Sequence, residues 1–366
     1  MNTKRALVLT NHLHDYAGSE VLSLEVAETL TEMGFEVRIH CNSHDPCIRS
    51  INPSIPVSDS DQFPDIFDYD FVWSQHLLIP IAVSQHGLRR THRTRIVSAH
   101  LSPFEPFEMT GLKSALILGA SIAANSFETA ERLKSLGVDD SEIHNLHNAC
   151  PDRYWVDHPR QKPAPGRILW VSNHLPQEVP RALKLLKSTG TKVEHIGNSG
   201  TKKRVTPEDI RSADAVISIG KTVQYAIKAG VPVYCYDHFG GPGWITRDSY
   251  ETAERFNYSG RCCRRTLPPE AIAKEITAEY ETAAQEVLLL RGHLKERYSL
   301  ERFLHLVTEK PPARQFESED HYRTARTQLA LEASQGYVVR KLYRANQQRR
   351  LKNKIRAKIS KILPAK

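Results

Sequence analysis

The residues best suited to bind a charged ligand follow a short apolar run, Ala215–Ile219, which is typical of a buried parallel strand. Gly220 and Lys221 come next, and a helix is predicted from Lys221 to about Ala229, because Gly230 supplies a C-terminal stop. Such a helix directs its first N–H groups and the positive end of its dipole at the carboxyl edge of the sheet. With the Lys221 ammonium beside it, this edge is predicted to bind a phosphate or diphosphate.

The same residues fit a loose P-loop pattern, Ala215-x4-Gly220-Lys221-Thr222. A P-loop needs flexible residues between its ends so that backbone N–H groups can surround the phosphates. The intervening residues here are mostly β-branched and prefer a strand, so a nucleotide triphosphatase is the less favoured interpretation. An ordinary turn with a solvated lysine remains open.

The rest of the chain supplies the elements that position this edge, since strand and helix patterns alternate along it. Arg5–Thr10 reads as a strand, and an apolar helix stopped by Gly34 precedes a second strand, Glu36–Cys41. This opening lacks the GxGxxG fingerprint, so NAD or FAD is not indicated and no cofactor is expected. The fold class predicted is α/β, built from two doubly wound, Rossmann-like domains.

Domain boundaries follow from composition, because a proline-containing segment separates the two sets of strands. The predicted divisions are a first domain, a linker, a second domain, a crossover helix and a basic tail, at residues 1–150, 151–166, 167–297, 298–310 and 311–366.

Three motifs resemble those of GT-B glycosyltransferases of the group 1 or family 4 type, which build bacterial cell-surface polysaccharides. They are Gly34-Phe35-Glu36-Val37, the helix end Ala226-x3-Gly230-Val231-Pro232-Val233, and the glycine segment Tyr236–Trp244. The glycine segment is expected to be a loop that approaches a ligand closely. The resemblance implies two domains facing a cleft, with a nucleotide sugar on the second and a glycan or lipid-linked acceptor on the first.

The resemblance also implies site residues for a sugar transfer that needs no metal. If the reaction inverts, a base must accept the acceptor's proton, and the candidates are His14, Asp15 and His100. The residues expected to bind the donor are Gly18, Asn173, Gly197, Lys221, Thr222, Gln224, Asp237, Gly240 and Gly241. The sequence Asp68-Tyr69-Asp70 is read as a solvated turn, so no metal site is assigned.

The sequence departs from the family pattern at the Glu-x7-Glu pair that many retaining members carry. Ile217 and Tyr225 occupy those positions. The stereochemistry therefore stays open, and two alternatives follow. One is a non-catalytic protein that binds a nucleotide sugar or glycan on this scaffold, and the other is a sugar-nucleotide epimerase of the same fold.

The basic character of the chain belongs to its C-terminal tail. The formal net charge is +8, but residues 336–366 hold eleven Lys and Arg and no acidic residue, which leaves −3 for residues 1–335. A helix there would align Leu351, Ile355, Ile359 and Ile362 on one face, as in helices that bind anionic membrane surfaces. Nucleic acid is not expected, because few aromatic residues are available for stacking.

Location is inferred from the start of the sequence and from its cysteines. No signal-peptide pattern precedes the first strand, no apolar run reaches the roughly 18 residues of a membrane span, and the six cysteines show no CxxC pair and no zinc spacing. We expect a cytoplasmic protein, peripheral at the inner membrane face.

Overall fold

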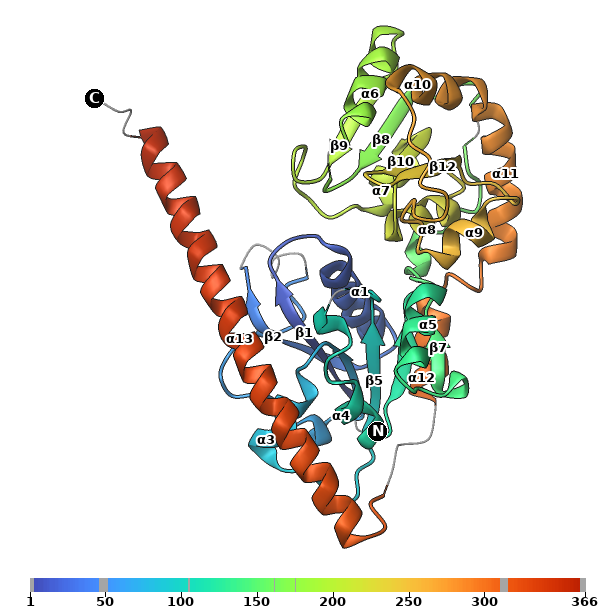
Figure 1. Cartoon of the computed structure of the whole chain (residues 1–366). Coiled ribbons are helices and arrows are strands. Elements are labelled where there is room, and N and C mark those ends of the chain that lie inside the picture. The colour runs from blue at the N-terminus through green and yellow to red at the C-terminus, as the bar shows by residue number, and fades with distance from the viewer. Residues whose placement is uncertain are drawn as a thin grey trace. The chain divides into compact units, whose positions relative to one another are not determined.

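The computed structural model describes residues 3–45, 52–104, 106–160, 162–174, 176–309 and 315–362. Contacts divide the chain into two compact units, which are described separately (Figure 1). The first unit comprises Met1–Ala123 and Val307–Lys366, and the second comprises Ala124–Leu306.

A seven-stranded sheet has the order β3-β2-β1-β4-β5-β6-β7. Its strands are β1 (Arg5–Leu13), β2 (Glu36–His44), β3 (Val57–Ser58), β4 (Phe71–Gln75), β5 (Arg95–His100), β6 (Ser121–Ala124) and β7 (Ile143–Asn145). The central strand β1 pairs in parallel with β2 and β4, and Val8 lies opposite Ile39 and Trp73. Since β1 and β4 are almost fully buried, their apolar runs show no alternation.

The helical elements of the first unit lie between and after these strands, and α1 is the helix that the sequence predicts before Gly34. They are α1 (Gly18–Glu32), η1 (Ile66–Asp68), α3 (Ile79–His86), η2 (Pro106–Glu108), α4 (Leu112–Ile117) and α13 (Glu319–Ile362). The carboxylate of Glu20 sets the start of α1, because it accepts the backbone N–H of Ala17 at 3.0 Å. The Asp68-Tyr69-Asp70 segment lies just before β4, at its amino end, where Asp68 pairs with Arg89.

The second unit is built on a five-stranded sheet of order β12-β11-β10-β8-β9. Its strands are β8 (Arg167–Val171), β9 (Lys192–Ile196), β10 (Ala215–Ser218), β11 (Val233–Asp237) and β12 (Gly240–Trp244). The predicted glycine loop is wrong, because Gly240–Trp244 forms β12, antiparallel to β11. A Cβ at Gly241 would lie 1.9 Å from the Cys235 carbonyl oxygen, so glycine here allows close backbone packing.

The helical elements of the second unit begin with α5 at the end of β6. They are α5 (Phe127–Ser135), η3 (Asp140–Glu142), η4 (Asp152–Tyr154), α6 (Glu178–Ser188), α7 (Pro207–Ser212), α8 (Lys221–Ala229), α9 (Tyr250–Arg255), α10 (Pro269–Ala278) and α11 (Tyr280–Leu294). The helix α12 (Leu300–Thr308) continues across the boundary between the units. Strand β10 begins at Ala215, so the residues that a P-loop needs as a flexible loop are a strand instead.

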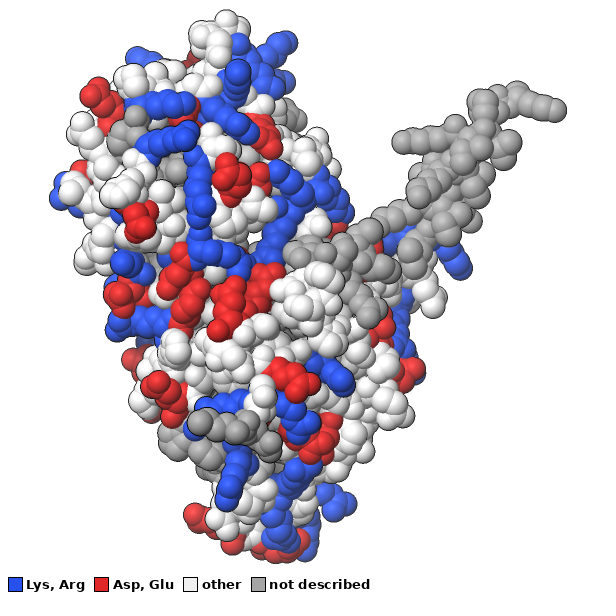
Figure 2. All heavy atoms as spheres, turned by 180° about the vertical axis from the view of Figure 1, so that it is seen from behind, with Lys and Arg blue, Asp and Glu red and all other residues white. Residues whose placement is uncertain are grey.

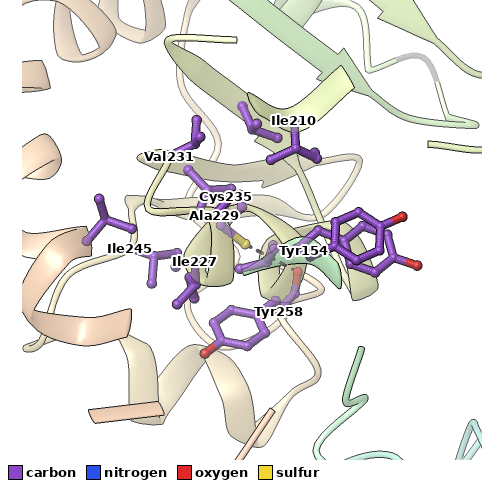
Figure 3. Close-up of a cluster of buried hydrophobic side chains, with 14 of the residues drawn as sticks. Tyr154, Ile210, Ile227, Ala229, Val231, Cys235, Ile245 and Tyr258 are labelled. Carbon is purple, nitrogen blue, oxygen red and sulfur yellow. Dashed lines mark hydrogen bonds between the residues drawn. The ribbon is translucent and has the colours of Figure 1, made fainter. Parts of the chain in front are cut away.

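One apolar core of the second unit packs α8 against the sheet and against η4 (Figure 3). Within it, the ring of Tyr225 stacks on that of Tyr154, with centroids 3.9 Å apart and planes inclined by 4°. Tyr225 is therefore a core residue, 2% exposed, at one of the two positions of the Glu-x7-Glu pattern.

The C-terminal helix α13 packs along the first unit, on α3, α4 and β2 (Figure 1). Arg340 is 4% exposed and donates hydrogen bonds to the backbone oxygens of Asp59 (2.9 Å) and Ser60 (2.5 Å). Gln347 donates to the His44 carbonyl at 2.6 Å. The part of the predicted tail from 336 to 350 is thus integrated into the first unit. The side chains of the predicted apolar stripe, Leu351, Ile355, Ile359 and Ile362, lie outside the described residues.

Among the described residues, every helix is too short or too polar to cross a bilayer. On the face drawn in Figure 2, Lys and Arg side chains are interspersed with Asp and Glu.

Acid should destabilise the first unit through His40. This side chain is fully buried, and burial, followed by the charge of Arg340, lowers its pKa from 6.5 to about 3. Its stabilising contribution is complete above pH 6.5 and is lost as the pH falls toward 3, because the unfolded chain binds the proton first. At pH 5, protonation of His40 in the unfolded chain should lower the free energy of unfolding by about 2 kcal/mol. Urea unfolding at pH 7 and pH 5 should show a smaller loss in His40→Leu, whereas the exposed control His158→Leu should behave as the wild type.

Candidate functional site

The candidate ligand site of the second unit lies at the carboxyl edge of its sheet, where the strand order reverses. Chain connections run from β8 to β9 on one side and from β10 to β11 on the other, so β8 and β10 flank the switch point. Open α/β sheets bind ligands at this place. At the end of β10, Gly220 adopts a φ of 60°, and α8 begins at the next residue. The first N–H groups of α8 therefore face this edge and can bind an anion.

Lys221 and Gln224 lie in the first turns of α8, and both side chains contact backbone. The ammonium of Lys221 donates to the carbonyl of Ala149 at 2.5 Å, and the side chain is 8% exposed. Gln224 is 1% exposed, and its side-chain amide lies 3.3 Å from the His147 carbonyl and beside the carbonyls of Gly220 and Lys221. Lys221 thus holds the backbone that follows β7, and its contact with a phosphate stays a prediction. Thr222 is also buried, at the N-terminus of the helix.

Asp237 ends β11, and its buried carboxylate contacts the residues that follow β8. It is 1% exposed, and its carboxylate lies 2.9 Å from Nδ1 of His174, which follows β8. Ser172 lies beside both: its hydroxyl is 3.3 Å from the Asp237 carboxylate and accepts the backbone N–H of His174 at 3.0 Å. The structure therefore brings Asp237 together with His174, a residue that the sequence analysis does not select. The neighbouring Asn173 is exposed at the same edge.

The predicted glycines of this unit pack against backbone. A Cβ at Gly197 would lie 1.8 Å from the Ser172 carbonyl oxygen, and one at Gly240 would lie 2.2 Å from that of Arg265. Gly197 thereby lets the turn after β9 come close to the end of β8. These glycines shape the edge, and their contact with a donor stays a prediction.

The candidate site of the first unit is the carboxyl edge of its own sheet. Gly18, predicted to bind the donor, begins α1 and belongs to this unit. The buried carboxylate of Glu20 accepts the backbone N–H groups of His14 at 2.6 Å and Asp15 at 3.0 Å. Burial raises the pKa of Glu20, although these hydrogen bonds act in the opposite direction. Glu20 is thus the residue that orders the loop carrying two of the predicted catalytic groups.

His14 and Asp15 both have partners within the first unit. Nε2 of His14 lies 2.8 Å from the Ser43 hydroxyl, and burial lowers the pKa of this imidazole. The carboxylate of Asp15 lies 3.2 Å from Arg350 of α13. The C-terminal helix therefore reaches the loop that holds the candidate base.

His100 ends β5, as predicted, but both of its ring nitrogens have partners. Nδ1 is 2.5 Å from the Glu108 carbonyl oxygen, and Nε2 is 3.2 Å from the Ser98 hydroxyl. The side chain is 1% exposed, and burial lowers its pKa. This environment suits a positioning residue better than a base, and the catalytic role of His100 stays a prediction.

A histidine–carboxylate pair that the sequence analysis misses lies at the end of β4. Nε2 of His76 is 3.1 Å from the buried carboxylate of Glu108, and the backbone N–H of Asn11 donates to Nδ1 at 3.4 Å. The φ of His76 is 66°, a left-handed backbone conformation that residues other than glycine seldom adopt. Burial acts to raise the pKa of Glu108, but the charge and hydrogen bond of His76 outweigh it, and the pKa is lowered. The rule that selects His100, a histidine at a strand's carboxyl end, also applies to His76.

Comparison with known proteins gives a fold but no sequence family. No family model matches the sequence, and no curated protein matches it. The crystal structure of Alr3699/HepE from Anabaena in complex with UDP and glucose aligns with a TM-score of 0.50 and 12% identity, over 91% of this chain and all of that chain. UGT89C1 from Arabidopsis thaliana, in complex with quercetin, aligns with a TM-score of 0.47 and 12% sequence identity, over 90% of this chain and all of that chain. The first similarity confirms the predicted fold: two Rossmann-like units of the GT-B type.

Proposed function

We propose that this protein is a glycosyltransferase that moves a sugar from a nucleotide sugar to a glycan or lipid-linked acceptor. The observation that carries the proposal is the helix α8, which begins directly at the switch point of a doubly wound sheet. A nucleoside diphosphate leaving group develops negative charge, and the helix N-terminus supplies preorganised donors for it. The structure of similar fold from Anabaena was solved with UDP and glucose, which supports this ligand class.

The acceptor is assigned to the carboxyl edge of the first unit, where several titratable groups gather. In an inverting reaction, His76 is our candidate base beside the predicted His14 and Asp15. A carboxylate at Nε2 favours the proton there, so Nδ1 is the nitrogen that can accept the acceptor's proton. Nδ1 now accepts a long hydrogen bond from the Asn11 backbone N–H, at 3.4 Å, and the incoming hydroxyl would have to replace that donor. Glu108 would then fix the tautomer and hold the ring in position. In a retaining reaction no such base is needed.

A nucleotide sugar should stabilise the chain against heat. One donor among UDP-, GDP-, dTDP-, ADP- and CMP-sugars, at about a hundred times its dissociation constant, should add roughly 2.7 kcal/mol. ATP is the control for the nucleotide triphosphatase interpretation. We expect Lys221→Met to abolish the shift and the exposed control Lys187→Met to preserve it. No shift with any sugar nucleotide, or a shift with ATP alone, would contradict the proposal.

A non-catalytic binding protein is the second candidate, and the burial of Tyr225 favours it. This side chain lies in the core and cannot contact the sugar as a glutamate of the missing pair would. Donor binding without any release of nucleoside diphosphate, across a panel of glycan and lipid-linked acceptors, would support this candidate. An epimerase would instead convert the donor without an acceptor, so the donor should be analysed after incubation alone.

We propose in addition that the protein binds anionic membrane surfaces through residues 351–366. Arg340, Arg344 and Arg350 contact the first unit, whereas residues 351–366 contribute six further Lys and Arg together with the predicted apolar stripe. Removal of residues 351–366 should therefore lower co-sedimentation with vesicles that contain anionic lipid. Vesicles of neutral lipid serve as the control, and equal binding by both chains would contradict this assignment.

A further inference from the structure

Three metal-ligating side chains meet at the carboxyl edge of the second unit. His174 follows β8, Asp237 ends β11 and His238 follows it, so β10 lies between the two contributing strands. A carboxylate oxygen of Asp237 is 2.9 Å from Nδ1 of His174 and 3.7 Å from Nδ1 of His238. One ligand atom from each residue lies within 4.8 Å of the other two.

These separations suit one shared ion. Bonds from a transition metal to imidazole nitrogen or carboxylate oxygen are about 2.0 to 2.2 Å long, so neighbouring ligand atoms around one ion lie roughly 3 to 3.5 Å apart. The two distances from the Asp237 carboxylate, 2.9 and 3.7 Å, lie on either side of that range. All three ligand atoms lie within 4.8 Å of one another, so the exposed imidazoles must rotate to share one ion. Two nitrogen ligands with one oxygen ligand favour a divalent transition metal such as Zn²⁺ over Mg²⁺ or Ca²⁺, which prefer oxygen alone.

Neighbouring residues hold the Asp237 carboxylate in place, while the two imidazoles remain open to solvent. Asp237 is 1% exposed, and the hydroxyl of Ser172 lies 3.3 Å from it while also accepting the backbone N–H of His174. Such outer contacts orient metal ligands. The side chains of His174 and His238 are 53% and 38% exposed, so solvent can reach an ion between them.

We propose that His174, Asp237 and His238 form a binding site for a divalent transition metal, with coordination positions open to solvent. Neither the sequence analysis nor the proposed transferase activity assigns these residues to a metal. The inference stands whether or not the chain transfers sugar. The competing explanation is a histidine that is hydrogen-bonded to an aspartate and binds no ion.

The test is titration of the full chain, prepared without a histidine tag, with Co²⁺ as a spectroscopic probe and Zn²⁺ as its competitor. We expect one Co²⁺ per chain, visible absorption of nitrogen and oxygen ligation, and displacement by Zn²⁺. His238→Ala and Asp237→Asn should each weaken binding at least about tenfold. His158→Ala, which removes an exposed histidine elsewhere in the unit, should leave the affinity unchanged.

The folding of the variants must be checked beside their metal affinity. Since His238 is partly exposed, its replacement should keep the metal-free unfolding temperature, so lost binding would not reflect lost folding. Absence of Co²⁺ binding, affinity unchanged in both variants, or a thiolate charge-transfer band from the cysteines would each overturn the proposal. A shift in unfolding temperature on adding Zn²⁺ to the wild type alone would support it.

Discussion

A chain that ends at Gln335 should lose the folded structure of its first unit, whereas one that ends at Arg350 should keep it. The segment between these ends carries Arg340, whose guanidinium supplies hydrogen bonds to backbone oxygens after β3 and to Asn42 (3.1 Å). It also carries Gly336, which packs against Ile81. Breaking a buried charged network costs about 3 to 5 kcal/mol, and whole domains are stable by only about 5 to 15 kcal/mol.

Point variants test the contribution of Arg340 to stability without shortening the chain. Arg340→Met should cost about 3 kcal/mol, because it leaves carbonyl oxygens of the first unit without their donor. Its neighbour Lys341 is exposed, so Lys341→Met removes the same charge and should cost less than about 0.5 kcal/mol. Hydrogen exchange measured by mass spectrometry can assign the loss to the first unit. Equal stability of the Arg340 and Lys341 variants would show that the tail does not stabilise the fold.

His76→Ala should lower kcat by about a hundredfold to ten-thousandfold if the reaction inverts. The imidazole accepts the acceptor's proton in this assignment, so its loss affects the chemical step. Binding of the nucleotide sugar should be unchanged, because the donor site belongs to the second unit. Turnover on the best acceptor and the thermal shift with the donor should be measured on the same preparation. Near-normal turnover would remove His76 as the base and leave His14, Asp15 or a retaining mechanism.

Glu108→Gln separates positioning from a structural role. The amide keeps the shape of the carboxylate but cannot stabilise a protonated His76, so kcat should fall and its pH profile should change while KM stays similar. A merely structural role of Glu108 would instead lower the unfolding temperature and leave the pH profile in place.

The local elements were predictable because local sequence encodes them. A β-branched run followed by glycine and a helix stopped by Gly230 predicts β10 and α8, and the structure confirms both. Apolar periodicity and stop residues act over a few positions, so they can be read from the sequence without knowledge of the tertiary structure. The predicted loop at Gly240–Trp244 was wrong because glycine can serve close strand pairing as well as a turn, and only the partner strand decides between them.

The candidate sites and the role of the tail depend on contacts between distant positions. His76 meets Glu108 across 32 positions, His174 meets Asp237 across 63, and Arg340 meets the Asp59 carbonyl across 281. A basic helix has the same pattern whether its charges face lipid or the backbone of its own domain. The sequence by itself therefore determined the alternation of strands and helices and the edges where ligands can bind. Only tertiary packing decided which charged groups meet there, because burial and pairing depend on what the rest of the chain places beside each side chain.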